Sequence, residues 1–538
     1  MCIDLFKKSD DKKEKPSVFF KSITFNDGTT ISLEQNSIVV FTGANNSGKS
    51  QVLKDLENIL DQNREMPTIV LNNAEYEFYG DIDESKFLGE NFSLNEQGQY
   101  QQINSGNSFQ IKTLKSWWKS HQLYSGMHKL FVKRLNTEIR LTVSNAPQRN
   151  YEAERHPVLK LLKSEALSEK ISDYFHQSFG VDLLLNRNDL CTLPLHVGKA
   201  PNSDAYTIKN QDEYYEKVSR LPKLQNQGDG MRSFASILLD TFTSEYPITL
   251  IDEPEAFLHP PQARVLGKML AKNNPDNRQL FISTHSEDFL QGLLDAENEN
   301  TTVIRINRQE NINKMNVLEN KEIKRLWSNP ILRYSNILSG LFHEKVIVCE
   351  SDYDCLFYQA VMNAMYENKN EIAPDILFTH CGGKQRAKDV VIALKAVNVP
   401  VIAVCDFDLL RDIGDFKSLV NAFGIDWKNT VYSEYKPILD SFNAKKSAGT
   451  DVWSYLKKTG KEGLDGDEPA AYEKVEFICK LFGLFIVPIG EMERFDKTIN
   501  KDKKDWVYEV LEIYDLATEP KLELARKFVQ EIVNFKID

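Results

Sequence analysis

The sequence predicts an α/β protein with two domains, each built on a largely parallel sheet. At 538 residues the chain is too long for one hydrophobic core. Short apolar runs alternate with stretches of helical periodicity, and the runs lie at 247–251, 279–283 and 302–306. After a boundary that we place near residues 330–342, the same alternation starts again. Strands that alternate with helices are typical of parallel sheets covered by helices.

The composition is that of an ordinary globular protein, with 41% apolar and 27% charged residues. The longest apolar runs have the length of strands, and the first residues form no apolar signal segment. The seven cysteines include no C-x-x-C pair. We therefore expect a reduced, cytoplasmic protein without a membrane span. A net charge of −12 argues against a general coat of nucleic acid but leaves room for a local basic surface.

The first predicted elements are an antiparallel hairpin and the buried strand that follows it. Residues 17–42 alternate apolar and polar side chains around the turn sequence Asn-Asp-Gly-Thr. The apolar strand at 38–42 then runs into Gly-x-x-x-x-Gly-Lys-Ser at 43–50, and a predicted helix follows at 51–60. A strand, a glycine loop and a helix in this order form the layout that a nucleoside triphosphate needs.

The glycine loop carries the residue types that phosphate binding requires. Its glycines let backbone N–H groups face the phosphates, its lysine reaches the β- and γ-oxygens, and its last serine ligates Mg²⁺. A glycine turn before an ordinary helix is the structural alternative. The residues that we expect to hold the nucleotide are Gly43, Asn45, Asn46, Ser47, Gly48, Lys49 and Ser50.

The next stretch is predicted to be an insert, at about 65–225, of loops and helices. Residues 85–110 are rich in Asn, Gln, Ser and Gly and are interpreted as a loop or a flexible insert. Residues 155–178 have helical periodicity, as do 255–273 and 286–295 further on. No Asp or Glu occurs from Gln97 to Thr137, where lysines alternate with Trp and Tyr. This pattern suits nucleic acid, and a solvated face over core aromatics explains it equally well.

Two acids follow the apolar run 247–251 and complete the nucleotide machinery. Asp252 is expected to hold Mg²⁺, and Glu253 to orient and deprotonate the attacking water. His285 ends the next strand, where it can sense the charge of the γ-phosphate. A surface acid pair and a structural histidine are the alternatives, and the preceding glycine loop makes them less attractive.

Glycines also precede the predicted helix at 234–241. Gly228 and Gly230 form an exposed N–H cradle that can cap the γ-phosphate of a partner in a head-to-head dimer. The alternative is a plain helix start after a flexible loop.

These segments resemble the ATP-binding cassette (ABC) ATPases of the SMC, RecF and Rad50 kind. The stretch Asp-Glu-Pro-Glu-Ala-Phe-Leu-His-Pro at 252–260 is especially similar to the pattern of the overcoming lysogenization defect (OLD) family. The resemblance implies that ATP is held between two protomers by 43–50, Asp252, Glu253 and His285. The loop at 228–233, from which the partner's contacts would come, departs from the Leu-Ser-Gly-Gly-Gln form of transporters.

The second half carries acids at the ends of three predicted strands. Glu491 and Glu493 follow the strand at 484–488, Glu350 follows the strand at 345–349 with Asp354 four residues later, and Asp406 and Asp408 follow the strand at 399–405. Period-two geometry predicts that the last two lie on one side of an extended chain. Such crowding of negative charge is unfavourable without a dication, and oxygen ligands suit Mg²⁺ or Mn²⁺. Separate helix caps and turns are the alternative.

The order of these acids resembles a TOPRIM domain, in which a pair of dications activates water for phosphodiester hydrolysis. Ser351 stands where the family pattern has a glycine. In the OLD type, acids after the last strand join the metal site, which points to Glu491 and Glu493. A later lysine assists catalysis there, and the sequence does not choose among Lys501, Lys503 and Lys504.

The resemblance implies an N-terminal ABC-type ATPase domain with a helical insert at 1–335, followed by a TOPRIM nuclease domain at 340–538. It implies an ATP-regulated, Mg²⁺- or Mn²⁺-dependent endonuclease that acts on DNA in antiphage defence as a homodimer or larger oligomer. A Gabija-type helicase, or a retron reverse transcriptase with its DNA, is an implied partner. The open alternatives are cleavage of RNA such as tRNA, and an ATP-dependent sensor or scaffold with a silent nuclease domain.

Overall fold

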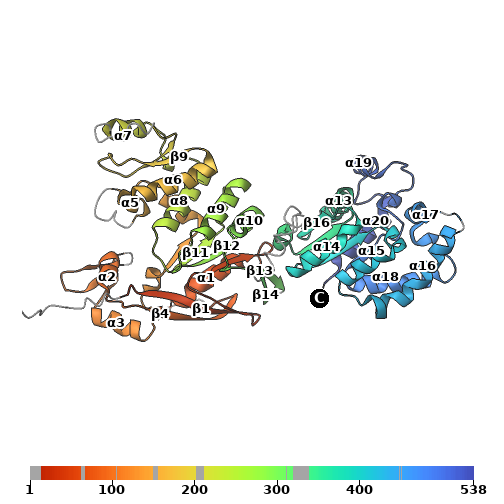
Figure 1. Ribbon diagram of the computed structural model, residues 1–538, viewed down its shortest axis with the longest axis horizontal. Coiled ribbons are helices and arrows are strands. Elements are labelled where there is room, and N and C mark those ends of the chain that lie inside the picture. Colours follow the sequence, from red (N-terminus) through yellow and green to blue (C-terminus); the bar gives the residue numbers. More distant parts are fainter. Residues whose placement is uncertain are drawn as a thin grey trace, which may run out of the picture. The chain divides into compact units, whose positions relative to one another are not determined.

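The chain divides into two compact units, Met1–Asn320 and Lys321–Asp538 (Figure 1). The computed structural model describes residues 14–61, 67–103, 106–148, 156–201, 211–309, 312–318, 338–447, 449 and 451–537. Most of the boundary region predicted at 330–342 lies outside these residues. Both units are mixed α/β, as the sequence predicts, and each is described separately. None of the described helices is long and apolar enough to cross a membrane.

The core of the first unit is a six-stranded sheet in the order β14-β13-β3-β12-β11-β8. All neighbouring strands are parallel except the pair β13–β14. β3 and β12 are buried along their whole length, which explains their uninterrupted apolar sequences. The strands are β3 (Ile38–Thr42), β8 (Val132–Leu135), β11 (Ile248–Asp252), β12 (Gln279–Ser283), β13 (Thr301–Gln309) and β14 (Ile312–Leu318).

The predicted N-terminal hairpin is confirmed and belongs to a separate antiparallel sheet, β2-β1-β4. Its apolar side chains pack in one core cluster with residues of β3 and of helix α1 (Lys49–Leu60). This packing fixes the elements on both sides of the glycine loop. The strands are β1 (Ser17–Phe25), β2 (Thr30–Ser32) and β4 (Leu71–Tyr79).

The interpretation of residues 85–110 as a loop is wrong. They form α2 (Ser85–Asn91) and a small sheet of β5 (Phe92–Leu94), β6 (Tyr100–Gln102) and β7 (Ser108–Phe109). Glu84 caps α2, and Phe92 and Phe109 are buried in the core cluster, so a few apolar anchors order a polar segment. The region 65–225 also supplies β8 to the central sheet.

The helical predictions hold with shifted ends. Residues 155–178 form two helices because Ser164 caps the second one, and the helix predicted at 255–273 begins only at Pro260, with His259 as its N-cap. The remaining elements of the first unit are α3 (Ile111–Lys119), η1 (Met127–Leu130), α4 (Thr137–Val143), α5 (Pro157–Leu162), α6 (Glu165–Phe179), β9 (Asp182–Leu185), β10 (Leu195–Gly198), α7 (Gln211–Ser219), η4 (Leu224–Asn226), α8 (Asp229–Thr243), α9 (Pro260–Lys272) and α10 (Glu287–Asp295).

The second unit has a four-stranded parallel sheet in the order β16-β15-β17-β18. The strands predicted at 345–349, 399–405 and 484–488 are confirmed as β15 (Lys345–Cys349), β17 (Val401–Cys405) and β18 (Leu484–Ile486), and β16 (Ile376–His380) completes the sheet. The chain goes from β15 to one side and then returns to β17 on the other side. The sheet therefore has its topological switch point between β15 and β17, where open α/β sheets bind ligands.

Helices surround this sheet, and the amphipathic C-terminal helix α20 buries Phe528, Ile532 and Val533 in the core. The helical elements are η5 (Leu338–Phe342), α13 (Asp352–Asn368), α14 (Lys384–Ala396), η6 (Phe407–Arg411), α15 (Ile413–Ala422), η7 (Trp427–Val431), α16 (Tyr432–Ser447), α17 (Val452–Thr459), η8 (Gly460–Gly463), α18 (Glu468–Leu481), η9 (Met492–Phe495), α19 (Lys503–Ile513), η10 (Pro520–Leu522) and α20 (Glu523–Asn534).

Candidate functional site

The glycine loop joins β3 to α1 in a conformation that its glycines make possible. Gly43 and Gly48 have φ of 138° and 105°. A Cβ on Gly43 would lie 2.2 Å from the carbonyl oxygen of Ile306 on β13, so no side chain fits there. The ammonium group of Lys49 donates to the carbonyl oxygens of Gly43 and Ala44 at 2.8 and 2.7 Å. The lysine thus lies folded into its own loop, while Asn45 and Asn46 are exposed.

The strands next to the loop bring in the expected magnesium ligand. The Ser50 hydroxyl donates to Oδ1 of Asp252 at 2.7 Å. The hydroxyl of Ser283, at the end of β12, donates to the same oxygen. The two serines hold the Asp252 carboxylate at the carboxyl edge of the sheet, beside the glycine loop. Ser50, Asp252 and the loop N–H groups suit a magnesium-bound triphosphate.

Glu253 and His285 meet at the same edge. Nε2 of His285 lies 3.3 Å from Oε1 of Glu253. Burial lowers the pKa of His285, and the positive charge of Lys49 adds to this effect, so the imidazole is neutral at neutral pH. Glu255 holds the main chain of the histidine, because its Oε1 accepts a hydrogen bond from the backbone N–H of His285 at 2.7 Å. A neutral imidazole next to a carboxylate can orient both the carboxylate and a water molecule.

The glycines of the predicted cradle lie at the start of α8. Gly228 precedes the helix and Gly230 is in its first turn. A Cβ on Gly230 would lie 2.6 Å from the carbonyl oxygen of Phe257. Glycine is therefore needed at position 230 for the close packing of α8 against the main chain of Phe257 within one protomer.

The carboxylates of the second unit collect at its switch point. Glu350 follows β15 and Asp406 follows β17, and Oε1 of Glu350 accepts from the backbone N–H of Asp406 at 3.0 Å. Asp354 lies in the first turn of α13, where its carboxylate and Ser351 cap each other. Serine in place of the family glycine thus stabilises the helix start that holds Asp354.

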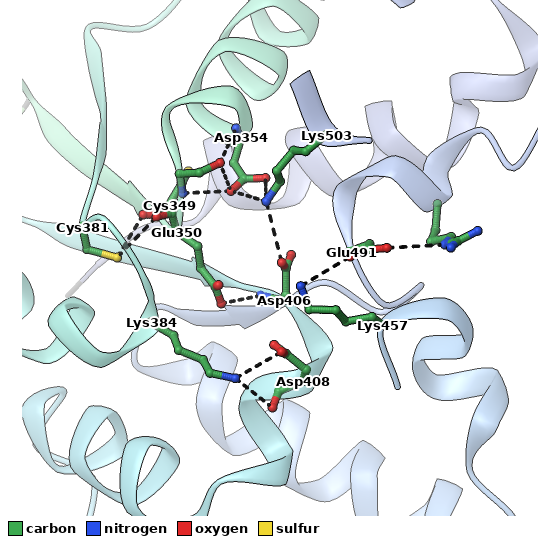
Figure 2. Close-up of polar contacts among 12 residues, drawn as sticks. Cys349, Glu350, Asp354, Cys381, Lys384, Asp406, Asp408, Lys457, Glu491 and Lys503 are labelled. Atoms are coloured by element: carbon green, nitrogen blue, oxygen red, sulfur yellow. Dashed lines mark hydrogen bonds and ion pairs between the residues drawn. The ribbon is translucent and has the colours of Figure 1, made fainter. Parts of the chain in front are cut away.

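Asp408 does not lie on an extended chain with Asp406, so that prediction is wrong. After Asp406 the chain turns into η6, because Phe407 is fully buried and its N–H donates to the carbonyl oxygen of Gly490 at 2.8 Å. Lys384, at the start of α14, donates to Oδ2 of Asp408 at 3.1 Å. Figure 2 shows this pair on the other side of Asp406 from Asp354.

Lysine side chains stand between the carboxylates (Figure 2). The ammonium group of Lys503 lies 2.8 Å from Oδ1 of Asp354 and 3.7 Å from Oδ2 of Asp406. Of the three lysines that the sequence offers, Lys503 is therefore the one at the site; Lys501 pairs with Glu509 instead. Burial alone would lower the pKa of Lys503, but the two aspartates outweigh it and raise this pKa above its ordinary value.

The two acids after β18 differ in their surroundings. Glu491 lies 3.6 Å from the ammonium group of Lys457 and 3.7 Å from Nε of Arg494. Glu493 is partly buried, and burial raises the pKa of its carboxyl group, which Lys503 opposes. Both acids thus lie near the cluster of Glu350, Asp354 and Asp406, and Glu491 is paired with Lys457 and Arg494.

Burial and mutual repulsion disfavour the charged forms of the central acids. Burial, and next the charge of Asp408, raise the pKa of Glu350 to about 7. Burial raises the pKa of Asp406 well above its ordinary value, and the charge of Lys503 opposes this shift. A dication would relieve both effects.

The chemistry of these donors fits a hard dication. Oδ1 of Asp408 and Oε2 of Glu493 are buried and have no hydrogen-bond partner, so each has free lone pairs for a ligand. Among the residues that the structure describes, however, no group of three or more Asp, Glu, His or Cys side chains is already arranged to coordinate a metal ion. Lysine ammonium groups occupy that space instead.

Two other sequence patterns have structural explanations. The thiol of Cys381 contacts the carbonyl oxygen of Cys349 at 3.2 Å, and burial raises the pKa of Cys381 to about 12, as expected of a core residue (Figure 2). In the acid-free stretch, Trp118 and Phe131 are buried in the core cluster and do not form a stacking surface. The lysines that are exposed there are Lys112, Lys115 and Lys119 of α3 and Lys129 of η1.

Comparison with protein families agrees with this division. A family model described as "AAA domain, putative AbiEii toxin, Type IV TA system" matches residues 134–290. A second model, described as "Overcoming lysogenization defect protein-like, TOPRIM domain", matches residues 341–408. The chain is an OLD-family ATPase–TOPRIM protein. It combines an ATPase domain with a nuclease domain, and these use ATP and a divalent metal.

Solved structures of SMC heads are similar to part of this OLD-family chain. An Smc head bound to the C-winged helix domain of ScpA has 14% identity and a TM-score of 0.32, covering 58% of this chain and 99% of its own. An Smc head from Pyrococcus furiosus has 12% identity and a TM-score of 0.33, with the same coverages. An SMC head from Thermotoga maritima has 10% identity and a TM-score of 0.29, covering 56% and 98%. No curated protein matches the chain.

Sequence reasoning missed several residues of the OLD-family sites. Ser283 orients Asp252, and the side chain of Asn313 on β14 donates to the carbonyl oxygen of Ser47 at 2.6 Å. Lys384 and Lys457 reach the carboxylates from α14 and α17. The glycine pair before Lys384 was a signal for a turn at this edge, whereas nothing in the sequence around Asn313 marks it.

Proposed function

We propose that this protein is an ATP-regulated, divalent-metal-dependent endonuclease that cuts DNA in antiphage defence. The observation that carries the proposal is the convergence of Glu350, Asp354 and Asp406 at the switch point of the second sheet. Buried carboxylates at such a point, with the pKa values of Glu350 and Asp406 raised by burial, are typical of a metal-dependent catalytic site. A separate nucleotide site on the same chain supports regulation by ATP.

In the first unit, Lys49 and the loop N–H groups bind the phosphates, and Ser50 and Asp252 hold Mg²⁺. Lys49 leaves its loop carbonyls for phosphate oxygens, which compete well because they are charged. Glu253 accepts a proton from the attacking water, and the neutral imidazole of His285 fixes the direction of this carboxylate. Gly228 and Gly230 contact the nucleotide of a second protomer.

In the second unit, Glu350, Asp354, Asp406, Asp408, Glu491 and Glu493 would hold the dications. Bound there, Mg²⁺ or Mn²⁺ would supply an activated water and stabilise the leaving oxygen of a phosphodiester. The residues of the chain fix the geometry: the backbone N–H of Asp406 orients Glu350, and Ser351 orients Asp354. Lys503 and Lys384 place positive charge where a phosphate would gain negative charge.

Several features support nucleic acid as the substrate. TOPRIM chemistry acts on phosphodiesters, and the exposed lysines of α3 suit a phosphate backbone. The family pattern favours DNA and a defence role, and the first family model carries the name of a toxin–antitoxin system. Because the carboxylate site does not contact the base or the 2′ position by itself, RNA remains the second candidate substrate.

Cleavage assays with matched variants test the proposal. Wild type, Asp406→Asn, Glu253→Gln and Asp496→Asn are incubated with supercoiled plasmid or total RNA, with ATP and Mg²⁺. Asp496 is equally buried in the same unit but bonds to Thr498 and Tyr514, so its variant controls for burial of an aspartate. We expect plasmid cleavage by wild type and Asp496→Asn but not by Asp406→Asn, and no ATP turnover by Glu253→Gln.

Each other outcome has a defined meaning. Cleavage by Asp406→Asn at the wild-type rate would overturn the nuclease site, and cleavage of RNA alone would overturn DNA as the substrate. ATP turnover without cleavage of either substrate would favour a sensor or scaffold, and the nucleic acid that copurifies with Asp406→Asn would then identify what it binds. Sedimentation of Glu253→Gln with ATP tests the dimer, and copurification tests a helicase or reverse transcriptase partner.

A further inference from the structure

Arg140 is a fully buried cation that contacts the main chain of the acid pair Asp252 and Glu253. It lies on α4, directly after β8, and its side chain has no exposed surface. Its guanidinium donates to the carbonyl oxygen of Asp252 at 2.6 Å and to that of Glu253 at 3.0 Å. Burial lowers the pKa of Arg140, and the charges of Glu255, Asp252 and Glu253 offset part of this cost.

The backbone that Arg140 holds is in an unfavourable conformation. Glu253 has φ of 49°, in the left-handed region that glycine prefers. The chain turns here because the N–H of Glu253 donates to the carbonyl oxygen of Ser283 on the neighbouring strand at 3.0 Å. A strained turn persists only when its surroundings hold it, and the fork of Arg140 holds the carbonyl groups on both sides of this residue.

The same side chain connects this turn to α8. Nε of Arg140 donates to the hydroxyl of Ser233 at 3.0 Å, and the hydroxyl of Ser236 donates to the Arg140 carbonyl oxygen. Arg232, also on α8, donates to the carbonyl oxygen of Leu141 at 2.8 Å. The helix that begins with the glycine cradle is thus joined through Arg140 to the acid pair.

We infer that Arg140 is a positioning residue for ATP hydrolysis, which sets the direction of the Glu253 carboxylate by holding its main chain and couples it to α8. This inference rests on the proposed role of Glu253 as the base. A lysine cannot replace Arg140, because a single ammonium group on a flexible stem does not bridge two carbonyl groups and a hydroxyl in a fixed plane.

The test compares Arg140→Lys with Arg278→Lys in the full chain. Arg278 is a matched control: it is buried in the same unit and donates to two carbonyl oxygens, of Thr241 and Ser244. We expect Arg140→Lys to lower the kcat of ATP hydrolysis at least about tenfold and to change the affinity for ATP less than about twofold, because the phosphate contacts come from other residues. Arg278→Lys should lower the Tm but keep kcat.

Ser233→Ala provides a second, milder variant that removes only one acceptor of the fork. We expect its kcat to fall about threefold or more with unchanged ATP affinity and a Tm near that of the wild type. Wild-type kcat in folded Arg140→Lys or in Ser233→Ala would overturn the inference, as would equal losses in the Arg140 and Arg278 variants. Glu253→Gln is measured in parallel: full turnover in that variant would overturn the proposed base itself, whatever the arginine variants do.

Discussion

Replacing Lys503 with methionine removes the cation that the metal-free carboxylate site depends on. The ammonium group lies 2.8 and 2.9 Å from the two oxygens of Asp354, and 3.7 Å from Asp406. The side chains of both aspartates are only 5% exposed, so water solvates their carboxylates poorly. Lys503→Met keeps the length of the stem but leaves buried negative charge without a partner. We therefore expect the metal-free protein to lose stability.

The size of the loss follows from the burial of the pair. Removing one partner of a buried ion pair costs about 3–5 kcal/mol. For a unit of roughly 200 residues, each 1 kcal/mol shifts the Tm by about 2–4 °C, so the second unit should melt roughly 6–20 °C lower. Mn²⁺ at about 100 times its Kd adds about 2.7 kcal/mol and should recover a large part of this loss.

The assay is thermal unfolding of the full chain at pH 8, without nucleotide, with EDTA or with increasing Mn²⁺. Lys501→Met is the control, since Lys501 is half exposed and pairs with Glu509 at the surface, where ion pairs contribute about 0–1 kcal/mol. Mn²⁺ should raise the Tm of Lys503→Met more than that of Lys501→Met. Equal Tm values for the two variants in EDTA, or equal responses to Mn²⁺, would refute the idea that lysine and dication serve the same carboxylates.

Three further predictions concern the nucleotide-binding unit. Gly43→Ala places a Cβ against a carbonyl group of β13, so it should abolish ATP binding in a filter assay, whereas Gly98→Ala, in open space, should not. Asn313→Ala removes the donor to the glycine loop and should weaken ATP binding about tenfold, or about 1.4 kcal/mol, by titration calorimetry. Burial raises the pKa of Asp240 from 3.8 to about 6. The protein therefore loses about 3 kcal/mol of stability as pH rises from below 3.8 to above 6, because the buried carboxyl group must then ionise. Asp240→Asn should therefore raise the Tm at pH 8 and leave it unchanged at pH 4; the same gain at both pH values would contradict the assignment.

The sequence predicted the strands and the strand-end acids well, because buried parallel strands have long apolar runs that end at the functional edge. β3 and β17 are buried over their whole length. The order of the polar insert at 85–110 is hard to predict because it depends on three separate buried phenylalanines, Phe87, Phe92 and Phe109, and single anchors leave no periodicity. The extended chain ends at Asp406 and not at Asp408 because Phe407 is buried against residues distant in sequence, Tyr472 and Gly490.

The sequence did not single out the cations that contact these acids, for a related reason: it offered Lys503 only as one of three lysines and did not mark Lys384, Lys457 or Arg140. Lys384, Lys457 and Lys503 come from three different helices, and only the folded sheet edge brings them to the acids. Arg140 has no neighbouring motif, and its role depends on the left-handed turn at Glu253. Sequence motifs mark the groups that perform chemistry, whereas the cations that position them are specified by tertiary packing.

Binding of Mn²⁺ in the absence of nucleotide tests the carboxylate site most directly, because it needs no trigger and no substrate. Electron paramagnetic resonance counts the free ion against wild type, Asp406→Asn, Asp496→Asn and Ser50→Ala. We predict a nucleotide-independent site that wild type, Asp496→Asn and Ser50→Ala share and that Asp406→Asn lacks. Equal binding of Mn²⁺ by Asp406→Asn and wild type would contradict the assignment of these acids as metal ligands.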